Sequence, residues 1–108
     1  MSGLSTHVLN AVTGAPATGM SVRLYDLSGA HLTSGITDDD GRITQVNGDP
    51  LVAGGYRLAF ATGEWFAANN IVGFYPQIDI SFTVDDPARH YHVPVLLSPF
   101  AYSTYRGS

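Results

Sequence analysis

The chain has 108 residues, with five arginines, no lysine and nine acidic residues, so its formal net charge is −4. This balance argues against binding to nucleic acid or to an anionic membrane surface, because both require a basic patch. The lack of cysteine excludes a thiol nucleophile, disulfides and thiolate metal ligands, and the lack of lysine excludes Schiff-base catalysis. Any reaction must therefore depend on histidine, arginine, carboxylates, hydroxyls, the backbone or a bound cofactor.

The length fits a single domain over residues 1–108, and 44% of the residues are hydrophobic, which is enough for one packed core. The first arginine is Arg23, and no apolar run approaches the roughly 18 residues of a membrane-spanning helix. The sequence thus has the features of neither a secretory signal peptide nor a membrane anchor. We expect a cytoplasmic protein with no membrane partner.

Apolar and polar residues alternate with a period of two through most of the chain, which is typical of half-buried strands. The predicted strands, in chain order, cover residues 6–12, 22–27, 35–37, 42–46, 56–60, 78–84, 90–97 and 102–105. Pro94 lies inside one of these strands, which predicts an edge position or a bulge, because proline donates no ladder hydrogen bond.

One short helix is predicted over residues 62–69, with Thr62 as its N-cap and Glu64 in its first turn. It spans about two turns, so packing must stabilise it. Seven or eight short strands with turns every ~8–12 residues predict an all-β sandwich or barrel. We favour a single antiparallel β-sandwich.

Histidines are the first candidates for chemistry, because the chain has no phosphate-binding loop, nucleophile elbow or zinc-protease motif. Residues two apart on a strand project from one face, so His90 and His92 face the same way. Such a pair suits a metal site or a base near neutral pH, although polar residues on a solvated face explain the pattern more simply. His7 allows the same two interpretations, and His31 is interpreted as a surface residue.

Two arginines are candidates for binding a planar oxyanion, because the guanidinium is a fixed cation with a planar array of donors. Arg42 follows a turn glycine and opens a strand, and Arg106 lies in the aromatic segment 102–108. That segment predicts either an ordered tail with a carboxylate in a site or a docked edge strand without chemistry. The pattern alone favours the docked strand.

The run from His90 to Ser108, which reads HYHVPVLLSPFAYSTYRGS, closely resembles the C-terminal signature of the 5-hydroxyisourate hydrolases, or transthyretin-like proteins. Three further blocks agree with that family, namely LSTHVL at 4–9, VRLY at 22–25 and TDDDGR at 37–42. The resemblance extends from Leu4 to Ser108. Val95 and Phe100 stand where leucine and tyrosine are more usual.

This resemblance implies a transthyretin-type sandwich of two four-stranded sheets with one short helix. It also implies a homotetramer, built as a dimer of dimers, with its sites in the channel at the dimer–dimer interface. The family opens the ring of 5-hydroxyisourate, the product of urate oxidation, to 2-oxo-4-hydroxy-4-carboxy-5-ureidoimidazoline, and it uses neither metal nor cofactor. Its catalytic positions fall on His7, Arg42 and His92. Its substrate-binding positions fall on Tyr105, Arg106, Gly107 and Ser108, whereas His90 matches no functional position.

The implied hydrolysis needs a base near neutral pH, and imidazole is suited to that role without tuning. We expect His7 and His92 to form the proton-transfer pair, with either as the base, and Arg42 to stabilise charge on the substrate oxygen. The alternative is a small-ligand carrier of the transthyretin type, since a fold does not determine a function. A carrier requires a mainly apolar channel, so these polar residues favour the hydrolase.

Overall fold

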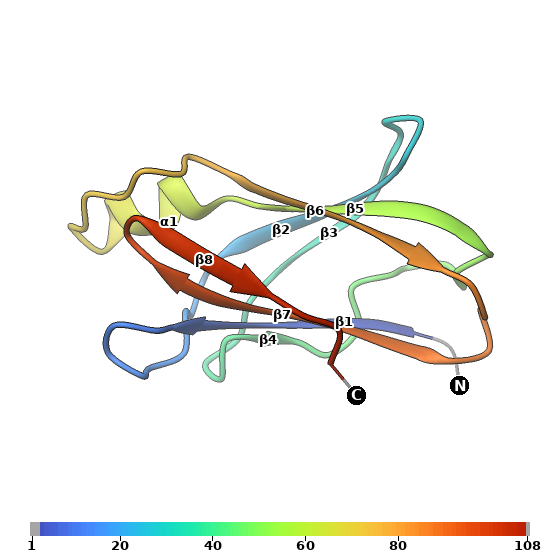
Figure 1. The fold of residues 1–108 in the computed structure, drawn as a ribbon, viewed down its shortest axis with the longest axis horizontal. Coiled ribbons are helices and arrows are strands. Elements are labelled where there is room, and N and C mark those ends of the chain that lie inside the picture. Colours follow the sequence, from blue (N-terminus) through green and yellow to red (C-terminus); the bar gives the residue numbers. More distant parts are fainter. Residues whose placement is uncertain (1–2, 108) are drawn as a thin grey trace.

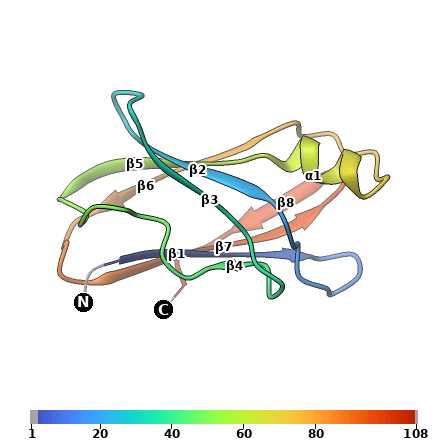
Figure 2. The same ribbon diagram turned by 180° about the vertical axis from the view of Figure 1, so that it is seen from behind.

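The computed structural model describes residues 3–107 as two facing β-sheets and one short helix (Figures 1 and 2). In chain order the elements are β1 (Gly3–Asn10), β2 (Ser21–Asp26), β3 (His31–Ile36), β4 (Arg42–Ile43), β5 (Gly54–Phe60), α1 (Thr62–Ala68), β6 (Ile78–Val84), β7 (His90–Ser98) and β8 (Ala101–Thr104). One sheet has the strand order β4-β1-β7-β8, and the other has the order β3-β2-β5-β6. The predicted all-β sandwich of two four-stranded sheets is therefore confirmed.

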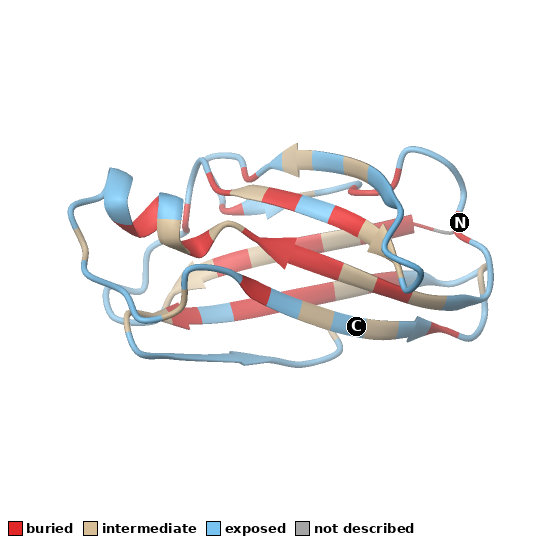
Figure 3. Cartoon of the chain, turned by 90° about the horizontal axis from the view of Figure 1, so that it is seen from above, coloured by how far each residue is buried: buried red, intermediate tan, exposed pale blue. Residues whose placement is uncertain are grey.

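The core lies between the two sheets, and buried residues alternate with more exposed ones along the strands (Figure 3). In β1, Leu4, Thr6 and Val8 are buried, whereas Ser5 and His7 between them are only half-buried. Thr6 satisfies its buried hydroxyl by donating a hydrogen bond of 2.6 Å to the carbonyl oxygen of Val93. The alternation thus turns Ser5 and His7 to the outer face of the sheet.

Strands β1 and β7 pair in parallel along the whole of β1, whereas every other strand pair of the two sheets is antiparallel, as predicted. The parallel register places Ser5 opposite His92 and His7 opposite Pro94. Alternation in a sequence indicates the faces of a strand but not its partner. The pair that departs from the antiparallel prediction therefore consists of β1, which contains His7, and β7, which contains His90 and His92.

Pro94 is inside a sheet, because β7 is paired with β1 on one side and β8 on the other. The predicted edge position is wrong, and no bulge is present: the register with β1 passes through Pro94 without a shift, and the register with β8 ends at Val95. The Pro94 carbonyl accepts a hydrogen bond of 2.8 Å from the Thr104 hydroxyl. The N–H and C=O of one residue lie on the same side of a strand, so the missing N–H faces the point where β8 ends. No ladder bond is lost there.

Helix α1 begins at the predicted residue and ends one residue early. The predicted N-cap is wrong, because the capping position is Ala61 and the Thr62 hydroxyl instead donates to the carbonyl of Tyr75, at 2.8 Å. Trp65 and Phe66 are buried in the core and hold the short helix in place. Between residues 3 and 107, no helix has the length and apolar character needed to cross a membrane.

A tight turn places Arg42 at the start of β4. The Asp38 carboxylate accepts hydrogen bonds of 2.9 Å from the backbone N–H groups of Asp40 and Arg42. Gly41 has a φ of +72° and its carbonyl accepts a 2.8 Å hydrogen bond from the N–H of Val8. A Cβ atom at position 41 would lie 2.4 Å from the Val8 carbonyl oxygen. The turn is therefore packed directly against β1.

We expect Gly41→Ala to destabilise the fold more than Gly14→Ala. Both glycines have a similar positive φ, of +72° and +77°, but nothing lies within 4 Å of a Cβ built at Gly14. The left-handed conformation should cost each variant about 1–2 kcal/mol, and overpacking should add about 1–3 kcal/mol at position 41 alone. Urea unfolding measures both values, and equal losses would contradict the close packing of this turn.

Candidate active site

The outer face of the β4-β1-β7-β8 sheet gathers histidine and arginine side chains from three adjacent strands. His7 of β1 is opposite Arg42 of β4, and Ser5 of β1 is opposite His92 of β7. His90 lies on the same face as His92, two residues earlier in β7, as the sequence predicts. All five residues are outside the buried core.

The Ser5 hydroxyl connects the two histidines of β7. Its oxygen lies 2.7 Å from Nε2 of His90 and 2.7 Å from Nδ1 of His92. His90 is exposed and His92 is half-buried. The three side chains therefore form a continuous hydrogen-bonded chain that leads from the more buried imidazole to the more exposed one.

Two hollows adjoin these residues, and Arg42 contributes to both. The first, of about 260 Å³, is lined by Ser5, Thr6, Arg42, Ile43, Thr44, His90 and His92. The second, of about 440 Å³, is lined by His7, Leu9, Pro16, Asp40 and Arg42. Arg42 thus lies between the hollow that His92 lines and the hollow that His7 lines.

The pKa of His92 is lowered from its usual value of 6.5, chiefly because partial burial penalises the cation. The positive charges of His7, His90 and Arg42 lower the pKa further, and only the contact with Ser5 opposes them. Burial and like charge both favour the neutral imidazole. His92 is consequently neutral at physiological pH, which is the form that can accept a proton.

Gly107 packs against the ring of His92. Its N–H donates a hydrogen bond of 2.9 Å to the His92 carbonyl, and a Cβ at this position would lie 2.5 Å from Cδ2 of the imidazole. The close approach therefore requires glycine. Among the predicted tail residues, Gly107 thus lies against a predicted catalytic side chain, and Ser108 lies outside the described residues.

Tyr105 and Arg106 are exposed and line a separate hollow of about 300 Å³. The guanidinium carbon of Arg106 lies 5.0 Å from the centre of the Tyr91 ring. The Tyr91 hydroxyl hydrogen-bonds to the Asp85 carboxylate; this bond, and more weakly the charge of Arg106, lowers the pKa of Asp85. Arg106 thus lies against the turn before β7, apart from Arg42. His92 borders both hollows.

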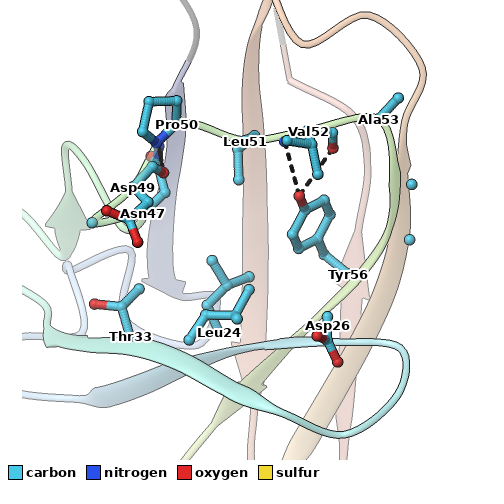
Figure 4. Close-up of a pocket in the computed structure, with 14 residues that line it drawn as sticks. Leu24, Asp26, Thr33, Asn47, Asp49, Pro50, Leu51, Val52, Ala53 and Tyr56 are labelled. Atoms are coloured by element: carbon cyan, nitrogen blue, oxygen red, sulfur yellow. Dashed lines mark hydrogen bonds between the residues drawn. The ribbon is translucent and has the colours of Figure 1, made fainter.

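A separate cavity of about 390 Å³ lies at a different place, under the loop that leads into β5 (Figure 4). None of the predicted site residues lines it. The Tyr56 hydroxyl donates to the Val52 carbonyl at 2.9 Å and accepts from the Val52 N–H at 3.0 Å, so this polar group is already satisfied within the loop. Asp26 and Asp49 are the charged residues among those that line the cavity, so it contains neither a histidine nor a cation.

Over residues 3–107, histidine and carboxylate side chains nowhere gather in a group of three that could hold a metal ion. The absence of a metal from the reaction stays a prediction. Sequence reasoning did not identify Ser5 as a functional residue, although its position two residues before His7 indicates the same face. Its link to His92 depends on the parallel register, which the sequence did not reveal.

The fold is that of a transthyretin-type sandwich, and comparison with known proteins identifies its family. The model of the HIUase/Transthyretin family matches residues 4–107. The 5-hydroxyisourate hydrolase of Caulobacter vibrioides is 46% identical over 115 aligned positions that cover both chains completely. The chain therefore belongs to the HIUase/Transthyretin family, and the resemblance found in its sequence is confirmed.

Two solved structures show how far the fold is shared. The structure of Klebsiella pneumoniae 5-hydroxyisourate hydrolase has a TM-score of 0.90 at 42% identity and covers 100% of this chain and 94% of its own. Sea bream transthyretin in complex with thyroxine has a TM-score of 0.88 at 28% identity and covers 97% of this chain and 94% of its own. The same sandwich thus occurs in an enzyme and in a protein that binds thyroxine.

We expect His92 to titrate below pH 6.5 in NMR experiments, and Arg42→Gln to raise its pKa by removing a positive neighbour. Arg57→Gln, in the other sheet, should leave it unchanged. Because folding lowers this pKa, protonation favours the unfolded chain, so the contribution of His92 to stability falls as pH drops below the unfolded value. A midpoint above 6.5, or one that Arg42→Gln does not move, would contradict this electrostatic account.

Proposed function

We propose that this protein is a 5-hydroxyisourate hydrolase that acts in urate degradation. The observation that carries the proposal is a half-buried imidazole with a lowered pKa, His92, on one face with Arg42 and His7. The whole-length similarity to the Caulobacter hydrolase supports the same substrate. The expected cytoplasmic location stays a prediction.

In the proposed reaction, water adds to a ring carbonyl of 5-hydroxyisourate and the adjacent C–N bond breaks. His92 takes a proton from water, because its environment keeps it neutral. The hydroxide adds to the carbonyl carbon, and Arg42 stabilises the negative charge that develops on the oxygen. The leaving ring nitrogen is then protonated, with His7 as the second member of the proton-transfer pair. The product is 2-oxo-4-hydroxy-4-carboxy-5-ureidoimidazoline.

The tail completes the proposed site. Gly107 holds the backbone against His92, while Tyr105 and Arg106 border the adjoining hollow. We propose that these residues, with the Ser108 carboxylate, shape the substrate pocket. A transthyretin-type carrier is less well supported, because a carrier pocket is lined mainly by apolar groups, whereas the hollow beside His92 contains a second histidine and an arginine.

The site is proposed to lie between the dimers of a homotetramer. Strands β6 and β8 are the edges of their sheets and lie on the same side of the sandwich, nearer the viewer in Figure 1 and farther in Figure 2. Unpaired edges are templates for pairing with another chain. Phe74, Phe100 and Tyr102 are exposed beside them. Pairing of these edges would form a dimer, and a second dimer would cover the histidine face.

We expect 5-hydroxyisourate, produced in situ from urate by a urate oxidase, to lose its ultraviolet absorbance faster when the protein is present. His92→Asn should lower kcat by about 10²–10⁴-fold, the usual contribution of a positioned base. Arg42→Ala should lower kcat by about 10²–10³-fold, as loss of an oxyanion donor does. His31→Asn, an exposed histidine of the other sheet, is the matched control.

A folded His92→Asn protein with unchanged turnover would refute the assignment of the base. If the native protein did not accelerate the decay at all, the hydrolase proposal itself would fail. The carrier would then be the leading candidate, and ligand binding would be measured next.

Sedimentation should show a species about four times the 11.5 kDa mass of the chain. Phe74→Asp should dissociate it, because a charge buried in an interface without a partner is costly. Val52→Asp is a matched control, since Val52 is 67% exposed and Phe74 is 69% exposed, but Val52 lies in the loop before β5. A native monomer, or equal effects of both variants, would contradict the proposed assembly.

A further inference from the structure

The two contacts of the Ser5 hydroxyl cannot both be donated by the serine. Each contact is 2.7 Å long, but a hydroxyl has one proton, so it can donate to one imidazole only. The other imidazole must donate its own N–H to the serine oxygen. The hydrogen bonds of His90, Ser5 and His92 therefore run in one direction or the other along the chain, and the direction determines which nitrogen of His92 carries its proton.

One direction makes His92 a base. If Nδ1–H of His92 donates to the Ser5 oxygen, the Ser5 hydroxyl donates to Nε2 of His90, and Nε2 of His92 is left with a free lone pair. Among residues 3–107, Nε2 of His92 makes no hydrogen bond, whereas Nδ1 is occupied by Ser5. In the opposite direction, Nε2 of His92 carries the proton and cannot accept another. Only the first direction fits the reaction proposed above.

We propose that Ser5 and His90 are positioning residues that fix the tautomer of His92 and carry its surplus proton to solvent. This inference rests on the proposed hydrolase function. When Nε2 of His92 takes a proton from water, its Nδ1 proton passes to the Ser5 oxygen. The hydroxyl proton of Ser5 passes at the same time to Nε2 of His90. His92 returns to the neutral state as the Nε2–H form, and the positive charge ends on His90. Loss of the Nε2 proton from His92 and return of a proton through His90 and Ser5 restore the Nδ1–H form for the next turnover.

Burial and charge favour transfer in that direction. His92 is half-buried and faces His7 of β1 and Arg42 of β4, as well as His90 on its own strand, and each of these charges opposes an imidazolium there. His90 is exposed, so water solvates its cation. The relay thus moves charge from a site that disfavours it to one that tolerates it, and from there to solvent.

Both imidazoles lie close to the backbone of a glycine. A Cβ at Gly107 would lie 2.5 Å from Cδ2 of His92, and a Cβ at Gly3 would lie 3.1 Å from Nδ1 of His90. Ser5 itself is held between them by the parallel register with His92. Because an orienting partner acts through geometry, this packing is what a positioning role for Ser5 requires.

The test compares Ser5→Ala, Ser5→Thr and His90→Gln, with His31→Gln as the control. Heteronuclear NMR of the imidazole nitrogens identifies the His92 tautomer without any substrate. The native protein should show the Nδ1–H form of neutral His92. Ser5→Ala should lose this preference and lower kcat by about 10–100-fold, as when the partner of a functional imidazole is removed. Ser5→Thr, which keeps the hydroxyl, should retain both the Nδ1–H form of His92 and the native kcat.

His90→Gln separates positioning from proton transfer. The glutamine carbonyl still accepts the Ser5 proton as a hydrogen bond but cannot take it up, so the Nδ1–H form should persist while kcat falls, and added imidazole buffer should restore part of the rate. Unchanged kcat in His90→Gln would overturn the relay. A native Nε2–H form, or a Ser5→Ala protein with unaltered tautomer, would overturn the positioning role. Because the tautomer is read without substrate, this failure is distinguishable from failure of the hydrolase proposal.

Discussion

The parallel pairing of β1 with β7 is the interaction on which the candidate site depends. It brings a strand from the beginning of the sequence beside one from its end, and its register places Ser5 opposite His92. A shift of one residue would turn the polar side chains of β1 into the core and its apolar ones outward. The burial of Leu4 and Val8 between the sheets therefore also maintains the geometry of the site. The packing of the core and the geometry of the candidate site therefore depend on the same β1–β7 register.

The outer face of this sheet concentrates positive charge in a protein whose net charge is −4. Arg42 is permanently charged, so the three nearby histidines cannot all be protonated without strong repulsion. Partial burial of the His92 imidazole, and next the charges around it, lower its pKa and keep this histidine neutral. Burial and repulsion together leave this imidazole in the neutral form that the proposed base requires. The fixed charge of Arg42 also remains free to stabilise negative charge on a substrate.

Much of the fold could be predicted from the sequence, because alternation and turn residues act locally. Strand β6 has the bounds that its alternation predicts, and α1 differs by one residue. The failures involve contacts between distant segments. The partner of β1, the interior position of Pro94 and the use of the Thr62 hydroxyl on the Tyr75 carbonyl all depend on which elements meet. Local patterns contain no information about such contacts.

The candidate site could likewise be predicted in part only, because some of its contacts join segments that are distant in the sequence. The residue pattern offered His7, Arg42 and His92 as candidates, and the resemblance to a family assigned them catalytic roles. The register brings the three onto one face. That resemblance assigned no role to His90, although the period of two had already placed it beside His92. The hydrogen bonds through Ser5 rejoin the two histidines in a way that neither approach predicted. Ser5 lies in the family block LSTHVL, but the resemblance assigned it no role, so the proposed role follows only from the two imidazoles that share its single proton.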